Sequence, residues 1–349
     1  MRPGLSSSRR GCEQMKVLVT GGTGFIGSHS VAALLSQGHQ VRLLVRSRDR
    51  VARSLSPLGV AEAESVLGDV TVPGSVEEAM AGCDAVLHAA AIYSFDARAA
   101  ARIREVNVRG TEIVLGAAVR AGLDPIVHVS SYVALLPPGG AVLTPDSPVT
   151  RPHGAYSRSK AESELVARRH QEQGAPVVIT YPGGVIGPHD PYLGESNRTM
   201  VEFINNGLTM RGGGMWVDVR DVAKVHAAVM EPGRGPRRYM ITGHYIALTD
   251  LTAALREIAG HHGRMVALPA GAAQAIGRMA DFVQHIVPGR LPLAYEGMWI
   301  AALQPHCDDS RTVKELGITP RDLRETLADT VRWLADQGHI SLTQARKAA

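Results

Sequence analysis

The 349-residue chain contains few aromatic residues and carries little net charge. Aromatic side chains make up 4% of the residues, which argues against a set of stacking platforms for nucleic-acid bases. The formal net charge is +4, too small to indicate a footprint on a phosphate backbone. We therefore expect no nucleic-acid partner.

Cysteine is equally sparse, since Cys12, Cys83 and Cys307 are the three in the chain and lie far apart. Their number and spacing match neither a disulfide framework nor a zinc site. No H-E-x-x-H motif occurs among the 14 histidines. We therefore predict no metal centre, and cysteine usage of this kind fits the reducing cytoplasm.

Long apolar runs are absent too. No stretch reaches the roughly eighteen apolar residues that a membrane-spanning helix needs, so no spanning segment is predicted. Residues 1–14 lack the apolar core of a signal peptide, and we interpret them as a flexible leader. Hydrophobic residues still make up 45% of the chain, which is enough to bury a substantial core.

The most informative stretch is residues 17–27, which read V-L-V-T-G-G-T-G-F-I-G. A short β-branched run, three glycines at spacings of three and an amphipathic helical pattern follow one another, as a dinucleotide-binding turn requires. Gly21 would allow the tight turn, Gly24 the approach of a pyrophosphate, and Gly27 the close packing of helix on strand. The phosphates would lie at the helix N-terminus, where free N–H groups and the helix dipole favour an anion.

Strand and helix patterns alternate over residues 15–181, which predicts an α/β fold with a doubly wound parallel sheet, the Rossmann fold. After the first strand we expect strands at 40–45, 65–67, 85–88, 126–130 and 177–180. We expect helices at 25–37, 75–81 with Ser75 as N-cap, 97–121 and 154–173.

The texture changes after Tyr181. We expect loops at 182–191 and 212–214, helices at 221–230 and 249–259, and an amphipathic helical ending from Val313. We assign residues 182–349 mainly to a smaller C-terminal substrate-binding part, with some segments returning to the main sheet. The apolar segment 266–304 fits either the packing of this part or an apolar substrate site near a membrane surface.

The end of the second strand discriminates between cofactors. Residues 41–48 read V-R-L-L-V-R-S-R, and no carboxylate appears before Asp49. An acidic residue at this position binds the ribose 2′-hydroxyl of NAD, whereas an arginine suits the 2′-phosphate of NADP. A guanidinium can bind a phosphate through two hydrogen bonds. We therefore predict that Arg46, supported by Arg48, selects NADP as the preferred cofactor, with NAD possible.

Tyr156 and Lys160 stand four residues apart on a predicted helix, so they share one face. A nearby cation lowers the pKa of a phenol, which is about 10 in a free tyrosine. Ser130-Ser131 ends the fifth strand, at the edge where ligands bind in such sheets. A tyrosine with a lowered pKa can donate a proton to a carbonyl oxygen, or take one from an alcohol, as a hydride moves.

Together these features resemble the extended short-chain dehydrogenase/reductases, the NAD(P)-dependent epimerase/dehydratase superfamily. The matching segments are T-G-G-T-G-F-I-G at 20–27, D-V at 69–70, H-A-A-A at 88–91, N-V-R-G-T at 107–111, Y-P-G-G-V-I-G-P at 181–188 and V-R-D-V-A at 219–223. The resemblance implies Ser131, Tyr156 and Lys160 as catalytic residues. With Arg46, it implies a cofactor site made by Gly21, Thr23, Gly24, Phe25, Ile26, Gly27, Asp69, Val70, Ala89, Ala90, Ala91, Tyr156, Lys160, Pro182 and Val185.

Within that superfamily, the end of the second strand at Arg46 resembles the dihydroflavonol reductase and 3β-hydroxysteroid dehydrogenase-like branch. Sugar-nucleotide epimerases usually carry an aspartate at that strand end. Tyr132 and Val133 follow Ser131 where dehydratases carry an Asp-Glu pair, which argues against sugar dehydration. Tyr181 also departs from the family pattern, which usually has Arg or Asn before the proline. The substrate contacts of this loop therefore stay open.

The resemblance implies an NAD(P)-dependent oxidoreductase that reduces a ketone or aldehyde, or oxidises the alcohol, of a small to medium and apolar substrate. An NAD-dependent sugar-nucleotide epimerase is the alternative, and Arg46 argues against it. A non-enzymatic NADP-sensing regulator would typically lack Tyr156 and Lys160. In related enzymes the helices matching 97–121 and 154–173 often pair across a dimer, so a homodimer is possible.

Overall fold

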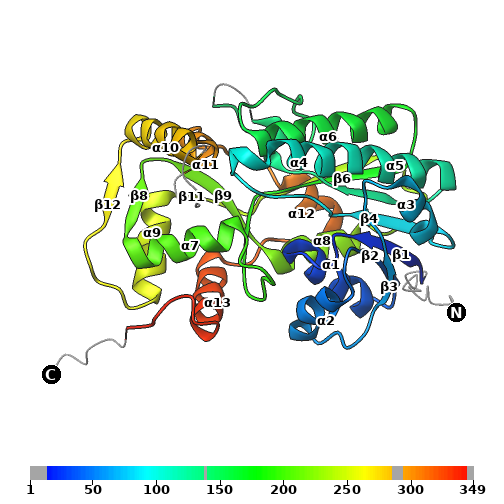
Figure 1. The fold of residues 1–349 in the computed structure, drawn as a ribbon, viewed down its shortest axis with the longest axis horizontal. Helices are drawn as coiled ribbons and strands as arrows, with labels where there is room; N and C mark the ends of the chain where they lie inside the picture. Colours follow the sequence, from blue (N-terminus) through cyan, green and yellow to red (C-terminus); the bar gives the residue numbers. More distant parts are fainter. Residues whose placement is uncertain (1–13, 137–139, 285–293, 344–349) are drawn as a thin grey trace, which may run out of the picture.

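The computed structural model describes residues 14–136, 140–284 and 294–343 (Figure 1). Residues 1–13, which make up nearly all of the predicted leader, lie outside the described residues, and so do residues 285–293 of the apolar segment. No helix in the described part of the chain is long and apolar enough to cross a membrane.

The main sheet has seven parallel strands within the described residues, in the order β3-β2-β1-β4-β5-β6-β10. They are β1 Lys16–Thr20, β2 Gln40–Val45, β3 Glu64–Leu67, β4 Ala85–His88, β5 Ile126–Val129, β6 Val177–Pro182 and β10 Arg237–Ile241. The strand order reverses between β1 and β4, which is the topological switch point where such sheets bind ligands. The predicted Rossmann fold is confirmed.

Helices cover both faces of this sheet (Figure 1). One face carries α3 Pro73–Met80, α4 Ala100–Arg104, α5 Gly110–Ala121 and α6 Ala155–Glu172, and the other α1 Phe25–Ser36, α2 Asp49–Leu55, α8 Val219–Ala228 and α12 Ser310–Leu316. In β1, Leu18 packs into the first layer while Val17 and Val19 pack into the second, and all three are fully buried. Burial on both faces explains why this strand is apolar without alternation.

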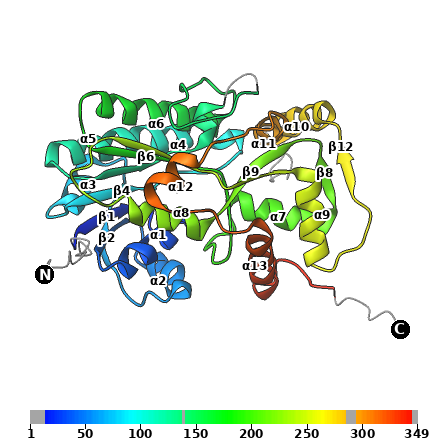
Figure 2. The same ribbon diagram turned by 180° about the vertical axis from the view of Figure 1, so that it is seen from behind.

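The remaining elements form a second body with its own apolar cluster. It contains β7 Gly184–Ile186, β8 Leu208–Met210, β9 Gly213–Asp218, β11 His244–Ala247 and β12 Val266–Leu268, with helices α7 Glu195–Asn206, α9 Leu248–Ile258, α10 Ala270–Gln284, α11 Tyr295–Ala302 and α13 Leu323–Asp336. The later helices α8 and α12 lie instead against the main sheet, as the view from behind shows (Figure 2), and β10 is its edge strand beside β6. The division of the chain at residue 181 stays a prediction.

Four local expectations were wrong. The loop expected over 182–191 contains the short strand β7, which pairs with β9. The helix expected over 97–121 is interrupted by a π-helical turn, Glu105–Arg109, where the side chain of Asn107 bonds Ile92 and Ser159 outside this helix. Gly213 and Gly214 are not in a loop but in β9, where they pair with β11. Ser75 does not cap a helix that starts at residue 76, since α3 begins two residues earlier at Pro73 and Ser75 instead bonds the backbone of Asp69.

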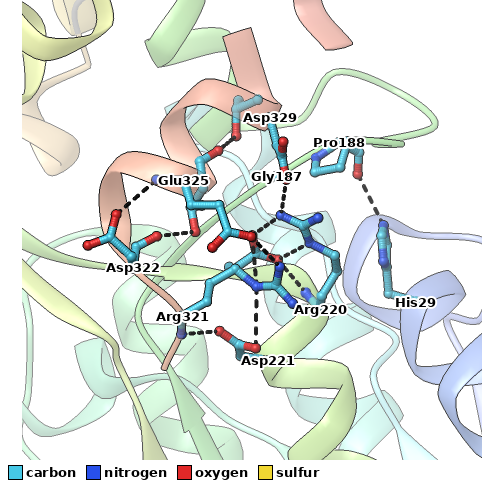
Figure 3. A network of polar contacts seen from close by, with 12 residues as sticks. His29, Gly187, Pro188, Arg220, Asp221, Arg321, Asp322, Glu325 and Asp329 are labelled. Atoms are coloured by element: carbon cyan, nitrogen blue, oxygen red, sulfur yellow. Dashed lines mark hydrogen bonds and ion pairs between the residues drawn. The ribbon is translucent and has the colours of Figure 1, made fainter. Parts of the chain in front are cut away.

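A network of ion pairs ties α13 to the start of α8 (Figure 3). Arg220 donates to the buried carboxylate of Asp218 at 2.6 Å and also pairs with Asp329 of α13 at 2.8 Å. The backbone N–H of Arg321, just before α13, donates to Asp221 at 2.7 Å. Residues far apart in the chain thereby hold the two bodies together at this point.

Candidate functional site

The glycine turn between β1 and α1 has the shape of a phosphate cradle. Gly21 has φ +75°, and a Cβ there would lie 2.6 Å from the backbone nitrogen of Ala90. A Cβ on Gly27 would lie 2.1 Å from the carbonyl oxygen of Gly21, so the helix can pack this closely only with glycine. Gly24 is the N-cap of α1 and makes no side-chain cap bond. The first turn of α1 also carries no acidic residue, so its N–H groups suit an anion, as the pyrophosphate of a dinucleotide requires.

A buried histidine fixes the strand ends beneath this turn. The ring of His88 makes two hydrogen bonds, from Nδ1 to Thr20 Oγ1 at 2.7 Å and from Nε2 to Thr111 Oγ1 at 3.1 Å. Burial, followed by the charge of Lys160, lowers the pKa of His88 to about 3. The ring is therefore neutral at pH 7, and it links β1, β4 and α5 without adding a charge.

The predicted adenosine end lies where β2 and β3 finish side by side. Arg46 and Arg48 are exposed there. Burial alone would raise the pKa of Asp69, but hydrogen bonds from Thr71 and the charges of Arg102 and Arg46 lower it below its usual value. A carboxylate and two guanidinium groups therefore gather at this end.

Twelve of the predicted site residues line one large cavity, namely Gly21, Gly24, Phe25, Ile26, Gly27, Ala89, Ala91, Ser131, Tyr156, Lys160, Pro182 and Val185. The structure does not place the other five in the cavity wall, and these are Thr23, Arg46, Asp69, Val70 and Ala90. Val70 packs instead near Gly110, where a Cβ would lie 3.0 Å from its side chain. Thr23 contributes a backbone carbonyl, which accepts from Ser54.

Tyr156, Ser131 and Lys160 all line this cavity. Tyr156 lies in the first turn of α6 and Lys160 one turn later, while Ser131 follows β5 and accepts from the backbone N–H of Val133 at 3.4 Å. Burial, followed by Tyr93, raises the pKa of Tyr156 above its usual range, and a hydrogen bond with Ser131 opposes the rise. The chain's own groups therefore keep the phenol protonated at neutral pH, and the lowered pKa that the sequence analysis expected from Lys160 is wrong because burial outweighs it.

Lys160 is buried, and its Nζ donates to the carbonyl oxygen of Val129 at 2.9 Å. Burial lowers its pKa to about 8, and the carboxylate of Glu164 opposes that fall. Glu164 also accepts from the hydroxyl of Tyr181 at 2.6 Å. Tyr181 is fully buried, bonds α6 and is not among the residues that line the cavity. At this position the departure from the family pattern therefore serves the packing of the core and not a substrate contact.

The cavity has a volume of about 760 Å³ and extends from the glycine turn into the second body. Its wall is largely apolar, with Phe95, Phe203, Met210, Trp216, Met298 and Ile300 among the lining residues. The basic side chains among its described lining residues are Lys160 and Arg198. A volume of this size suits a small-molecule ligand. Within the described residues, no group of three or more His, Cys, Asp or Glu side chains could hold a metal ion.

Sequence reasoning missed several groups around Tyr156. The ring of Tyr93 lies 4.7 Å from that of Tyr156, centroid to centroid, and Phe95 meets it edge-on at 6.1 Å. Asn107, at the π-helical turn, donates to Ser159 Oγ at 2.9 Å and accepts from the backbone of Ile92 at 2.7 Å. The N-V-R-G-T segment marked Asn107, but nothing in the sequence pattern placed the two aromatic rings beside the tyrosine.

Comparison with known proteins agrees with this geometry. The model of the NAD dependent epimerase/dehydratase family matches residues 17–242, which include the glycine turn, the Tyr-Lys pair and β10. The chain belongs to this family. Its members are NAD-dependent oxidoreductases and dehydratases, so the chain is identified as an enzyme of the extended short-chain dehydrogenase/reductase type.

Two curated relatives in this family match the chain nearly end to end. The sterol demethylase protein B of Methylococcus capsulatus is 32% identical over 93% of this chain and 100% of its own length. A putative dihydroflavonol 4-reductase of Synechocystis is 33% identical, over 92% and 95% of the two chains. Among solved structures, a double mutant of the dTDP-glucose 4,6-dehydratase DesIV of Streptomyces venezuelae, with NAD bound, is 29% identical with a TM-score of 0.71, over 92% of this chain and 97% of its own. The predicted branch of the family is confirmed.

Proposed function

We propose that this enzyme is an NADP-preferring reductase of a ketone or aldehyde on a largely apolar substrate, or the dehydrogenase of the corresponding alcohol. The observation that carries the proposal is that Tyr156, Ser131 and Lys160 line the same cavity as the glycine turn and the apolar side chains of the second body. A proton donor in this wall can serve a substrate that lies in one cavity with the cofactor.

The glycine turn fits a dinucleotide, and when bound the nicotinamide supplies a hydride to the substrate carbon or accepts one from it. The chain's own residues handle the proton. In reduction, the phenol of Tyr156 donates its proton to the substrate oxygen, and the hydroxyl of Ser131 donates a hydrogen bond to the same oxygen. Burial keeps Tyr156 protonated at neutral pH, which is the form that reduction needs. The ammonium of Lys160 stabilises the phenolate that remains.

The preference for NADP rests on the adenosine end. Arg46 and Arg48 carry exposed guanidinium groups after β2, and no carboxylate stands between the strand and Asp49. A 2′-phosphate can accept two hydrogen bonds from one guanidinium. NAD is bound in the DesIV structure, and its binding here stays an outcome of the test.

The apolar side chains of the cavity wall support a hydrophobic substrate over a sugar nucleotide. The half of the cavity that the second body lines includes the carboxylates of Asp190, Glu195 and Glu202, against Arg198 as its basic group. A nucleotide diphosphate in this half would meet more negative than positive charge, which costs free energy. The curated relative named as a sterol demethylase protein fits a substrate of this apolar kind.

The test is a parallel fluorescence titration with NADPH and NADH, followed by a panel of ketones and aldehydes of rising apolar size. We expect NADPH to bind about tenfold more tightly than NADH. We also expect kcat/KM to rise with the apolar surface of the ketone or aldehyde until the cavity is filled. Equal affinity for NADH would overturn the cofactor preference. Protein that arrives loaded with NAD and epimerises a sugar nucleotide would overturn the reductase.

We also propose that the enzyme forms a homodimer through α5 and α6, as the sequence analysis anticipated. Both helices lie on the outer face of the main sheet (Figure 1), and Val119 of α5 and Leu165 of α6 are 36% and 51% exposed. Covering apolar side chains on such a face with a second copy removes them from water, which lowers the free energy of the assembly. Light scattering should give twice the mass of the chain, and a monomeric mass would contradict the proposal.

A further inference from the structure

The helix that carries Tyr156 lacks an N-terminal cap from its own segment. The N-cap residue of α6 is Gly154, which has no side chain to accept a hydrogen bond. A carboxylate from α11 takes that place: Glu296 accepts from the backbone N–H of Ser157 at 2.7 Å and of Tyr156 at 3.3 Å. It also accepts from the Ser157 hydroxyl at 2.6 Å. A residue 139 positions away thus does what an N-cap side chain normally does.

The fit between these two segments is tight. A Cβ on Gly154 would lie 1.8 Å from the carboxyl carbon of Glu296, so a larger residue there would displace the carboxylate. Glu296 is 6% exposed. Burying a carboxylate is costly unless it is hydrogen-bonded, and three donors with the positive end of a helix dipole meet that need. The carboxylate of Glu296 therefore fits at the helix end only because residue 154 is a glycine.

The same short helix also forms part of the cavity wall. Gly297, Met298 and Ile300 of α11 line the cavity directly after Glu296. A Cβ on Gly297 would contact the ring of Phe95, and Phe95 meets Tyr156 edge-on. The same short helix therefore lines the cavity with the residues that follow Glu296, while Glu296 itself holds the first turn of α6.

We propose that Glu296 is a positioning residue, which holds the first turn of α6 so that the Tyr156 phenol stays in line with Ser131 and Lys160. Through α11 it makes this alignment depend on the packing of the cavity wall around the substrate. The inference rests on the proposed function, because it assumes that Tyr156 transfers the proton.

The carboxylate also acts on the phenol through its charge. Tyr156 is faced by Tyr93, by Tyr132 after β5, by Lys160 one turn along α6, and by Glu296. After burial and Tyr93, the negative charge of Glu296 contributes to the raised pKa of Tyr156. Asp281 of α10 in turn faces Glu296. Replacing Glu296 by a neutral residue should therefore lower the pKa of the phenol.

The experiment compares Glu296→Gln, Glu296→Ala and Gly154→Ala with Tyr156→Phe, using pH profiles of alcohol oxidation. We expect kcat to fall about tenfold in Glu296→Gln and further in Glu296→Ala, with cofactor affinity within about twofold. The apparent pKa of oxidation should move down by about half a unit in Glu296→Gln, since oxidation needs the phenolate. Gly154→Ala should behave as Glu296→Ala does, although residue 296 is unchanged.

Asp322→Ala is the matched control, because Asp322 caps α13 by accepting from Glu325 N–H at 3.0 Å, away from the cavity wall. It should lower the melting temperature without changing the pH profile. If Tyr156→Phe keeps full turnover, the proposed function is wrong. If Tyr156→Phe is inactive but Glu296→Gln and Gly154→Ala behave like Asp322→Ala, the proposed function stands and the role of Glu296 is wrong.

Discussion

The ammonium of Lys160 donates to the backbone carbonyl of Val129 across 2.9 Å, and this bond ties the second turn of α6 to the end of β5. The charge is held in a buried place that water scarcely reaches. A buried charged lysine destabilises the fold because its ammonium loses hydration. Destabilising groups of this kind are common at functional sites of proteins.

Replacing this lysine should therefore stabilise the protein while removing activity. A lysine whose pKa falls from 10.5 to about 8 on folding costs about 3 kcal/mol of unfolding free energy at pH 7. Lys160→Met removes that cost but leaves the Val129 carbonyl without its donor, so we expect a net gain of about 1–2 kcal/mol at pH 7. Urea unfolding of both proteins measures it.

The pH dependence gives this prediction its sign. Between about pH 8 and 10.5 the native state binds fewer protons at Lys160 than the unfolded state, so wild-type stability rises with pH. The advantage of Lys160→Met should be complete below pH 8 and shrink as the pH rises through that range. Lys224→Met, at a lysine whose side chain is 55% exposed, should show no such trend. A constant gap from pH 7 to 10 would contradict the buried-charge explanation.

Removing the phenol hydroxyl should abolish the proton transfer. We expect Tyr156→Phe to reduce kcat by about 10² to 10⁴, with the NADPH dissociation constant nearly unchanged, because general acid catalysis contributes this much. Single-turnover and steady-state kinetics measure the loss. Tyr239→Phe, whose hydroxyl donates to Glu315 at 2.9 Å away from the cavity wall, is the matched control. Full turnover in Tyr156→Phe would rule out its role.

The cofactor preference can be tested at one residue. Arg46→Ala should weaken NADPH binding about tenfold, since a charge-assisted bond to the 2′-phosphate is lost, and should leave NADH within about twofold. Titration by cofactor fluorescence measures both constants. Arg120→Ala, which breaks an exposed pair with Glu77 at 2.9 Å, is the control. Equal weakening of both cofactors would show that Arg46 does not read the 2′-phosphate.

The network in Figure 3 predicts a stability effect. Asp218 is fully buried, and Arg220→Ala would leave its carboxylate without its main partner. We expect a loss of about 2–4 kcal/mol in unfolding free energy at pH 7. Arg332→Ala, at a 69% exposed side chain that shares Asp329 as a partner, should cost less than about 0.5 kcal/mol.

Acid should remove the difference between Arg220→Ala and wild type. Burial alone would raise the pKa of Asp218, but the hydrogen bonds and charge of Arg220 lower it below its usual value. That depression contributes stability above the unfolded pKa of about 3.9, and the contribution is lost as the pH falls through the lower native value. Unfolding from pH 7 to 3 should therefore show the gap closing below about pH 4, and an unchanged gap would assign the loss to packing alone.

The sequence by itself determined the parts of the site that depend on short-range spacing. Three glycines at fixed offsets specify a turn and a close helix approach, and the structure has both at Gly21 and Gly27. Four residues on a helix bring Tyr156 and Lys160 to one face whatever surrounds them. The alternation of strands and helices likewise predicted the parallel sheet, because apolar periodicity reflects burial directly.

Only the tertiary structure decided what meets those elements from far along the chain. Glu296 caps α6, the rings of Tyr93 and Phe95 face Tyr156, and Tyr181 turns into the core to bond Glu164. Gly213 and Gly214 read as a loop because glycine favours turns, yet pairing with β11 makes them a strand. These contacts join residues with no fixed spacing, so no local pattern encodes them, and they appear only once the packing of the two bodies brings the segments together.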